Sequence, residues 1–304
     1  MSAPTVSVVV PTRDRPGLLR SALAAIREQA YPGPVETIVV YDRSAPDTTL
    51  AGGDDHRRVR VVANDRVPGL AGARNTGILA ATGELLAFCD DDDRWLPGKL
   101  AAQVAALTAD PAAELVCCGI RVRYAEHAVD RGVGADRVGF AELLRDRRTE
   151  LHPSTFLFRR AALVDGIGLV DEALPGSYAE DYELLLRAAR RTDVRAVADP
   201  LVEVRWHEQS FFARRWATIA EALRWLLDRY PEFADVPRGA GRIRGQIAFA
   251  EAAAGRRRHA LRWVGRTLRS APREPRAYLA LAVAAGAVGP DRVLRALHRR
   301  GRGI

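Results

Sequence analysis

Residues 85–100 read LLAFCDDDDRWLPGKL, and this stretch indicates the fold most clearly. The short apolar run Leu85–Cys89 is typical of a strand that is buried on both faces of a sheet. Pro97 suits the first turn of a helix, so the residues before it lie where a strand leaves its sheet. In open α/β sheets, ligands bind beyond the carboxyl ends of the strands. The four aspartates Asp90–Asp93 are therefore expected to face a binding site.

The spacing of these aspartates predicts a metal site. Asp90 and Asp92 are two residues apart, which lets both carboxylates reach one hard divalent cation and the phosphates that it carries. Four neighbouring aspartates without a cation would repel one another at a cost in stability. The alternative is a solvated acidic turn, because short motifs often match by chance. The apolar strand before the aspartates and the segment WLPGKL after them favour the metal site.

Length and composition point to a globular protein. The 304 residues are enough for a full hydrophobic core and predict one large and one smaller domain. The first ten residues, MSAPTVSVVV, lack the basic start and long apolar run of a signal peptide. The longest later apolar stretch, Ala277–Gly289, is too short to cross a bilayer. Cys89, Cys117 and Cys118 lie in apolar runs without metal-ligand spacing. A cytoplasmic protein with buried thiols is expected.

The net charge of +8 is unevenly distributed along the chain. Residues 237–304 contain 16 arginines and only three acidic residues, whereas the rest contains 30 basic and 35 acidic residues. A basic segment on a mildly acidic body suggests a local partner such as an anionic membrane, an acidic protein or nucleic acid. The alternative is a solvated helical face, which is what most charge runs are.

Strand and helix patterns alternate in the first hundred residues. Apolar and β-branched runs predict strands at Thr5–Val10, Val35–Tyr41 and Val59–Ala63. Helical spacing of apolar residues begins at Pro16, and a second helical pattern covers Gly69–Gly83. This alternation predicts right-handed βαβ units and an α/β fold with a mostly parallel sheet between helices.

After residue 100 the pattern becomes more varied. The predicted elements are the strand Leu115–Tyr124, the helix Val138–Arg145, the strand Phe156–Phe158, the helices Ala161–Val164 and Tyr182–Arg191, and the strands Val194–Ala198 and Leu201–Trp206. Glu180 and Asp181 precede one of these helices, where the helix dipole stabilises carboxylates, and His207 follows the last strand. Beyond Phe211, helices are expected at Ile243–Ala254, Arg257–Ser270, Arg276–Ala285 and Arg292–Arg299.

Several short motifs occur in the order in which they occur in one known family. They are SVVVPT at Ser7–Thr12, Asp42-x-Ser44, ARNTG at Ala73–Gly77, Asp90–Asp93 followed by Trp95 and Pro97, and Glu180–Asp181. Over about the first 210 residues the chain resembles the inverting glycosyltransferases of family 2, which have the GT-A fold. Each motif alone is weak evidence, whereas the ordered set is specific.

The resemblance implies a fold, a division of the chain and an activity. Residues 1–210 would form a Rossmann-like GT-A domain, with a nucleotide-sugar half at about 1–100 and an acceptor half at about 101–210. Residues 211–304 lie outside the resemblance and are expected to form a helical, arginine-rich C-terminal region. The implied activity is metal-dependent inverting transfer of a sugar from a nucleotide-diphosphate sugar to the hydroxyl of a glycan, lipid-linked or secondary-metabolite acceptor.

The resemblance also implies which residues contact the donor. Those expected to bind the nucleotide or its phosphates are Pro11, Thr12, Arg13, Asp42, Arg74, Asn75, Asp90 and Asp91. Those expected to hold Mn²⁺ or Mg²⁺ with the diphosphate are Asp92, Asp90 and His207. Tyr41, Arg43 and the pair Arg13–Asp14 depart from the residues that are common in the family, which leaves the nucleotide base open.

On the acceptor side, Asp181 would be the general base that deprotonates the hydroxyl, and Glu180 would shape the acceptor pocket. His152 is interpreted as structural. Simpler interpretations stay open for three residues: a turn cap for Asp42, a solvated helix position for Arg74 and an interfacial position for His207.

Two other classes of protein fit the sequence less well. A nucleotidyltransferase would have a glycine-rich phosphate loop, and the stretch PTRDRP at residues 11–16 contains no glycine. A nucleic-acid-binding tail would interleave aromatic residues with its arginines, and this one offers only Phe249, Trp263 and Tyr278, so nucleic acid is disfavoured. The partner favoured for Arg256–Arg302 is an anionic membrane surface, which would give a peripheral position at the inner face of the membrane.

Overall fold

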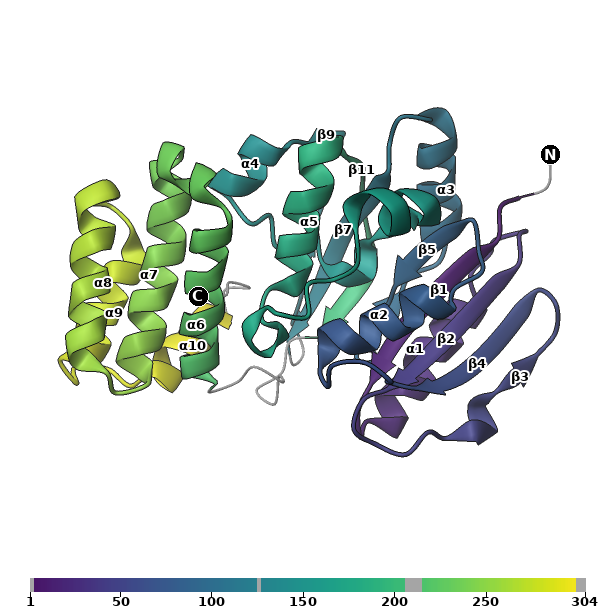
Figure 1. The fold of residues 1–304 in the computed structure, drawn as a ribbon, viewed down its shortest axis with the longest axis horizontal. Helices are drawn as coiled ribbons and strands as arrows, with labels where there is room; N and C mark the ends of the chain where they lie inside the picture. Colours follow the sequence, from purple (N-terminus) through teal and green to yellow (C-terminus); the bar gives the residue numbers. More distant parts are fainter. Residues whose placement is uncertain (1–2, 125–126, 206–214, 299–304) are drawn as a thin grey trace.

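The computed structural model describes residues 3–124, 127–205 and 215–298. A mixed sheet runs through the α/β part with helices on both of its faces, and helices α6 to α10 stack beside it at one end (Figure 1). The strands lie in the order β3-β4-β2-β1-β5-β10-β7-β11-β6, while β8 pairs with β7 and β9 pairs with β11. The α/β class expected from the sequence is confirmed.

The first half of the sheet is parallel, apart from the short β3 (Gly52–Gly53) at its edge. Its strands are β1 (Val6–Thr12), β2 (Val35–Tyr41), β4 (Arg57–Ala63) and β5 (Leu85–Phe88). The strands predicted in this region are therefore confirmed. Because parallel strands end at the same edge, the residues that follow β1, β2 and β5 come together there.

The second half of the sheet is mixed. Its strands are β6 (Arg94–Trp95), β7 (Leu115–Tyr124), β8 (His127–Arg131), β9 (Arg137–Val138), β10 (Leu157–Arg159) and β11 (Val194–Arg205). The short β10 runs antiparallel to both of its neighbours, β5 and β7, whereas β11 is parallel to β7. The expectation of a mostly parallel sheet therefore holds for the first half only.

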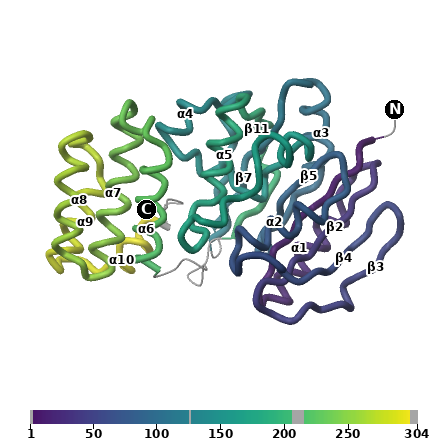
Figure 2. Tube along the Cα trace, viewed as in Figure 1, coloured from purple at the N-terminus to yellow at the C-terminus, as the bar shows by residue number. Residues whose placement is uncertain are grey.

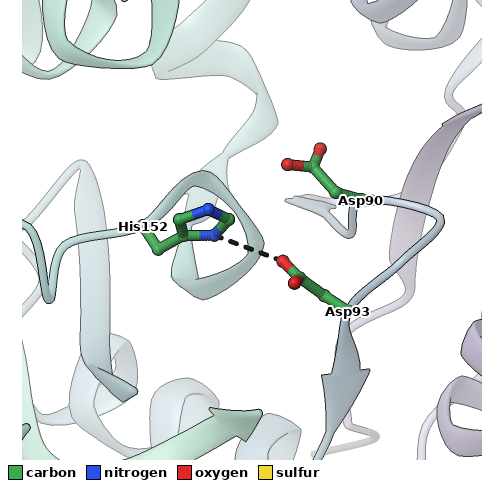
Figure 3. A group of neighbouring side chains, drawn as sticks. All are labelled: Asp90, Asp93 and His152. Atoms are coloured by element: carbon green, nitrogen blue, oxygen red, sulfur yellow. Dashed lines mark ion pairs between the residues drawn. The ribbon is translucent and has the colours of Figure 1, made fainter. Parts of the chain in front are cut away.

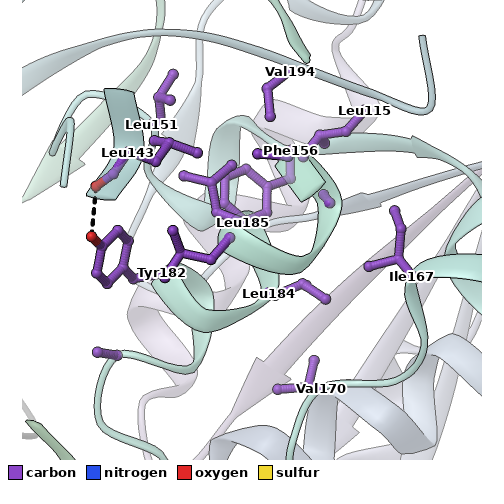
Figure 4. Packing of buried hydrophobic residues seen from close by; sticks show 14 of the residues in the cluster. Leu115, Leu143, Leu151, Phe156, Ile167, Val170, Tyr182, Leu184, Leu185 and Val194 are labelled. Carbon is purple, nitrogen blue, oxygen red and sulfur yellow. Dashed lines mark hydrogen bonds between the residues drawn. The ribbon is translucent and has the colours of Figure 1, made fainter. Parts of the chain in front are cut away.

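Each face of the sheet has its own hydrophobic core, because successive residues of a strand point to opposite faces. The covering helices are α1 (Pro16–Arg27), α2 (Leu70–Ala80), α3 (Lys99–Ala109), α4 (Phe140–Arg145) and α5 (Glu180–Arg191). Val9 of β1 packs in the cluster of α2 and α5, whereas Val8 and Val10 pack in the cluster of α1 and α3. Figure 4 shows the first cluster, with Tyr182 and Leu185 of α5 close to Leu143 of α4.

The C-terminal helices continue this packing. They are α6 (Trp216–Arg229), α7 (Pro237–Ala253), α8 (Arg257–Ser270), α9 (Pro275–Ala284) and α10 (Pro290–His298), which confirms the predicted helical region. Figure 2 shows α6 and α7 nearer to the α/β part than α8. Leu223 of α6 and Ile243 of α7 belong to the same core cluster as α5, whereas α8 to α10 pack in a cluster with the far side of α7.

The predicted boundary between the two parts of the chain, at residue 210, lies within 206–214, outside the described residues. In the described ranges, every helix is too short or too polar to cross a membrane.

Several predicted elements differ from the structure. Helix α3 begins at Lys99, so Pro97 lies before it, and the helix expected from Val138 begins at Phe140, because Val138 belongs to β9. The helix expected to end at Gly83 ends at Ala80, and the Gly83 N–H donates to Ser7 Oγ at 2.8 Å. A Cβ at Gly83 would lie 2.7 Å from Ser7 N, so this glycine allows close passage over β1 and does not end the helix. The two strands expected at Val194–Ala198 and Leu201–Trp206 form the single strand β11, whose pairing with β7 is irregular around Pro200.

Candidate functional site

The residues expected to contact the donor gather at the carboxyl ends of three parallel strands. Pro11 and Thr12 end β1, Asp42 follows β2 directly, and Asp90 comes two residues after the end of β5. Thr12 is paired with Tyr41 in the sheet, so the loops after β1 and β2 leave from the same edge. This arrangement brings together side chains that are up to about eighty positions apart in the sequence.

The loop after β1 holds the middle of the aspartate run. Thr12 Oγ1 donates a hydrogen bond to Asp91 at 2.7 Å, and Arg15 Nη1 lies 3.2 Å from Asp91 and 2.8 Å from Asp92. Burial raises the pKa of the Asp91 carboxyl to about 6, although Thr12 and Arg15 act in the opposite direction. Asp91 thus connects the loop after β1 with the loop after β5. Its direct contact with a nucleotide stays a prediction.

Asp93 is the most buried member of the run and is held by Ser154. Ser154 Oγ donates to Asp93 Oδ2 at 2.5 Å and accepts from the Asp90 N–H at 2.9 Å. The Trp95 indole N–H donates to the Ser154 carbonyl at 3.0 Å. One serine of the segment before β10 therefore fixes both ends of the aspartate run.

His152 completes a group of possible metal ligands. Its Nδ1 lies 3.3 Å from Asp93 Oδ2, and one ligand atom each from Asp90, Asp93 and His152 lie within 4.8 Å of one another (Figure 3). Burial raises the pKa of Asp93 well above its ordinary value and lowers the pKa of His152. Two carboxylate oxygens and a neutral imidazole nitrogen are ligands that suit Mn²⁺ or Mg²⁺, so the residues present fit a divalent cation.

Arg74 connects the aspartate run with the start of α5. Its Nη2 lies 2.6 Å from Asp90 Oδ1, and its Nη1 forms an ion pair with Glu180. The Arg74 side chain is 1% exposed, and its guanidinium lies 5.4 Å from the ring centroid of Phe88. The alternative of a solvated helix position is therefore wrong. A single buried guanidinium joins two acidic motifs that are far apart in the sequence.

Asp181, the expected general base, lies in the first turn of α5 beside Glu180. Arg147 Nη2 contacts both of its carboxylate oxygens, at 2.9 and 2.8 Å. Burial by itself would raise the pKa of Asp181, but the Arg147 guanidinium, with smaller contributions from His152 and Arg74, holds this pKa below its ordinary value. The carboxylate is therefore ionised and is oriented by one arginine.

Asp42 organises the loop that leads into α2. Its Oδ1 accepts from Asn64 Nδ2 at 2.8 Å and from the Gly69 N–H at 3.0 Å. This geometry agrees with the simpler interpretation of a turn-capping carboxylate. A contact from Asp42 to the nucleobase stays a prediction.

Asn75 is fully buried and binds the segment before α5. Its Nδ2 donates to the Val170 carbonyl at 2.9 Å and to Glu172 at 2.7 Å, while its Oδ1 accepts from the Val170 N–H at 2.9 Å. Both the nitrogen and the oxygen of the Asn75 amide are thus hydrogen-bonded within the protein. This geometry favours a positioning role for Asn75 over the expected nucleotide contact.

Arg13 does not take part in the contacts described above. Arg13 is exposed, and it forms an ion pair with Asp14 at 3.7 Å. His207, which was expected as a metal ligand, lies outside the described residues. Their roles toward the donor stay predictions.

Sequence reasoning missed several residues that the structure brings to the site. Asp93 was visible as part of the run, and His152 and Ser154 were visible in the polar stretch HPST before β10, but no local pattern pairs them. Arg15 and Arg147 belong to ordinary charged stretches and carry no signal of their own. Only the folded chain shows that both contact carboxylates of the site.

Comparison with known proteins supports the resemblance. A model of "Glycosyl transferase family 2" matches residues 7–165, which are more than half of the chain. An uncharacterized glycosyltransferase of Mycobacterium tuberculosis is 32% identical over 197 residues, which are 62% of this chain and 70% of that protein. An Escherichia coli UDP-Glc:alpha-D-GlcNAc-diphosphoundecaprenol beta-1,3-glucosyltransferase is 31% identical over 102 residues, which are 33% of this chain and 39% of that enzyme.

Solved structures share the fold. S. aureus TarS 1–349 in complex with UDP-GlcNAc superposes with a TM-score of 0.60 at 17% identity, covering 98% of this chain and 92% of that one. The mannosyltransferase PcManGT from Pyrobaculum calidifontis in complex with GDP-Man and Mn²⁺ gives 0.56 at 21% identity, covering 95% and 82%. The fold is GT-A, and the nucleotidyltransferase alternative has no support. The chain spans only 32% to 39% of the length of the first curated relatives that it matches. It belongs to glycosyl transferase family 2.

Proposed function

We propose that the protein transfers a sugar from a nucleotide-diphosphate sugar to an acceptor hydroxyl, with a divalent cation and with inversion at the anomeric carbon. One observation carries this proposal: Arg74 pairs with both Asp90 and Glu180. This contact brings the aspartate run close to the first turn of α5, which contains Asp181, and so supports one shared site. Donor and acceptor chemistry therefore have their residues next to each other.

The cation would be held by Asp90 together with other members of the acidic cluster. The structure brings Asp93 and His152 to Asp90, whereas the family resemblance points to Asp92 and His207. When bound, Mn²⁺ or Mg²⁺ would neutralise the leaving diphosphate. Arg15 and Arg74 keep the aspartate loop in place for this task, because they contact three of its four carboxylates.

Asp181 would accept the proton of the acceptor hydroxyl. An inverting transfer is a single in-line displacement, so one base on the face opposite the diphosphate is sufficient. The low pKa of Asp181 keeps it ionised, and the N-terminus of α5 adds to this effect. Glu180, paired with buried Arg74, would align the first turn of the helix and so shape the acceptor side.

Relatives indicate the classes of donor and acceptor. Solved neighbours bind UDP-GlcNAc, or GDP-Man with Mn²⁺, and one curated relative acts on a diphosphoundecaprenol-linked sugar. We assign this chain a nucleotide-sugar donor, and among acceptors we favour a lipid-linked sugar. Residues 1–210 would form the catalytic domain, and residues 211–304 would form a helical region that supports it.

A peripheral membrane position is part of the proposal. Helix α8 exposes Arg257, Arg258 and Arg262 together with Leu261, whose side chain is 52% exposed. Basic helices with exposed apolar residues bind anionic membrane surfaces reversibly. A lipid-linked acceptor would be presented at such a surface.

A thermal-shift screen tests the donor and the metal. Nucleoside diphosphates are added to the full chain with Mn²⁺ and, in parallel, with excess chelator. A ligand at a hundred times its Kd stabilises the folded state by about 2.7 kcal/mol. We expect one or two bases to raise the melting temperature with Mn²⁺ and to have little effect with chelator. Equal shifts in both conditions would contradict a metal-bridged diphosphate.

A further inference from the structure

Partly buried Arg147 and buried Arg242 lie close to Asp181, the expected catalytic base, and to Tyr182. Arg147 contacts Asp181, and its guanidinium carbon lies 5.8 Å from the ring centroid of Tyr182. Arg242 of α7 approaches the same ring, with its guanidinium carbon 5.4 Å from the centroid. The two guanidinium groups therefore border one aromatic ring, although they come from segments almost a hundred residues apart.

Arg242 has no carboxylate partner among the described residues. It is 8% exposed, and its Nη2 donates to the Tyr182 hydroxyl at 3.0 Å. That hydroxyl itself donates to the Leu143 carbonyl at 2.6 Å, so it is a neutral partner that does not balance the charge of Arg242. The Arg242 Nε is buried without a hydrogen-bond partner. A buried charge that is left unpaired is costly, so this residue needs an explanation.

The surroundings do not neutralise the surplus charge. Burial and the nearby Arg147 and Arg276 lower the pKa of Arg242, and the adjacent Asp146 is exposed and forms no ion pair with it. Arg276 pairs with Glu274 at 2.8 Å, and its Nε is also buried without a partner. Arg147 and Arg276 thus each pair with a carboxylate, Asp181 and Glu274, whereas Arg242 has only the exposed Asp146 nearby and forms no ion pair with it.

We infer that Arg147 and Arg242 bind a phosphate group of the acceptor substrate, next to Asp181. A guanidinium recognises phosphate through several parallel hydrogen bonds, and such charge-assisted bonds are strong. A phosphate presents oxygens on several sides and suits donors that come from two elements, whereas a carboxylate presents two oxygens in one plane. The side chain of Arg147 is 28% exposed, so an anion can reach the pair from solvent.

This inference rests on the proposed function only in assigning the anion to the acceptor. It gives helix α7, which lies beyond the residues matched to the family, a role in substrate recognition. It also predicts that the acceptor carries its phosphate close to the hydroxyl that receives the sugar. An anion on Arg147 would share the guanidinium with Asp181 and so weaken the hold of Arg147 on the base.

Substitution of Arg242 separates a binding role from a structural one. Arg242→Met keeps the apolar stem over Tyr182 and removes the unpaired charge, so without phosphate it should raise the melting temperature. Titration of inorganic phosphate into the full chain in excess chelator should show binding to wild type and about tenfold or more weaker binding to the variant. Arg238→Met, at an exposed arginine of the same helix, is the matched control and should bind phosphate like wild type.

Further measurements keep the inference falsifiable. Arg147→Met should also weaken phosphate binding, which provides a second variant if Arg242→Met does not fold. Phosphate should bind together with the nucleoside diphosphate and Mn²⁺, because the two sites are separate. In transfer assays, Arg242→Met should raise KM about tenfold for a phosphorylated acceptor and leave KM unchanged for its dephosphorylated form.

The opposite results would overturn the inference. They are destabilisation by Arg242→Met with unchanged phosphate affinity, displacement of phosphate by the nucleotide, or equal loss of phosphate affinity in Arg238→Met. Equal KM effects on both acceptor forms would also reject the acceptor assignment. Phosphate binding is measured without donor or metal, so its failure is distinguishable from failure of the proposed transferase mechanism.

Discussion

The aspartate side of the site has a surplus of negative charge, whereas the Asp181 side has a surplus of positive charge. On the first side, Arg15 and Arg74 contact three of the four carboxylates of the run, and Arg74 also pairs with Glu180. On the second side, Arg147 pairs with Asp181, whereas Arg242 donates only to the neutral Tyr182 hydroxyl and has no carboxylate partner among the described residues. The two sides lie next to each other, because Arg74 spans from the aspartate run to the first turn of α5.

This difference shows how a site can be preorganised for two ligands of opposite charge. A surplus of carboxylates fits a divalent cation, which then attracts a diphosphate. A surplus of guanidinium groups fits an anion directly. The unpaired groups cost stability in the free protein, and ligand binding recovers that cost. The first three predictions below change one side and leave the other intact, and the fourth lies outside both.

The largest effect is expected from Asp181→Asn, which keeps the size of the side chain and removes its basicity. Loss of a general base typically lowers the rate by a factor of about a hundred to ten thousand. Donor affinity should stay close to wild type, because the aspartate side is untouched. Steady-state kinetics and donor titration measure both quantities. NMR of the wild-type product should show an anomeric configuration opposite to that of the donor. A product with the donor's configuration would contradict inversion. An Asp181→Asn variant with a rate within a few-fold of wild type would reject Asp181 as the base.

On the aspartate side, excess chelator should abolish transfer. The ligand set is decided by comparing Asp92→Asn with Asp93→Asn, each assayed for nucleoside diphosphate binding with and without Mn²⁺. Asparagine at position 93 keeps an acceptor for Ser154, so the local fold should be retained. The substitution that lowers Mn²⁺-dependent binding about a hundred-fold marks the aspartate that binds the metal, since the metal contributes several kcal/mol to diphosphate binding. Full activity in chelator would rule out the metal.

Arg147→Met should change the pH dependence of transfer. With Arg147 present, the pKa of Asp181 is low, so the base stays ionised and activity falls only as the pH drops through this low value. Without Arg147, burial acts with less opposition and raises the pKa of Asp181. The acidic limb of the kcat profile should therefore move to higher pH. An unchanged limb would mean that the titrating base is another group.

The smallest effect is expected on helix α8, outside both sides of the site. Replacing exposed Arg257, Arg258 and Arg262 with glutamine should weaken flotation with anionic liposomes, by about 1 kcal/mol for each charge near the surface. Transfer to a water-soluble acceptor should not change. Removal of the whole region from Pro237 onward is a poor test, because it would expose the core that Ile243 and Ile247 share with α5. Equal liposome binding of the wild type and the triple glutamine variant would reject the membrane contact.

Local sequence patterns were sufficient for most elements of the fold. The strand Val35–Tyr41 and the helix Arg257–Ser270 have their predicted bounds, because apolar periodicity and flanking breakers depend on neighbouring residues only. The same kind of reasoning placed Asp90–Asp93 after a buried strand and Asp181 at a helix start. The motif order then identified the family that the comparisons support.

The sequence by itself therefore determined the order of the elements, the family and the acidic motifs of the proposed site. Only the tertiary structure decided which side chains pair. Arg242 was one of 16 arginines in a basic tail, and folding alone separates it, buried against Tyr182, from the exposed Arg257 and Arg258. The physical reason is that the pairing and burial of a charge depend on residues brought close by the packing of distant elements, which local periodicity does not encode.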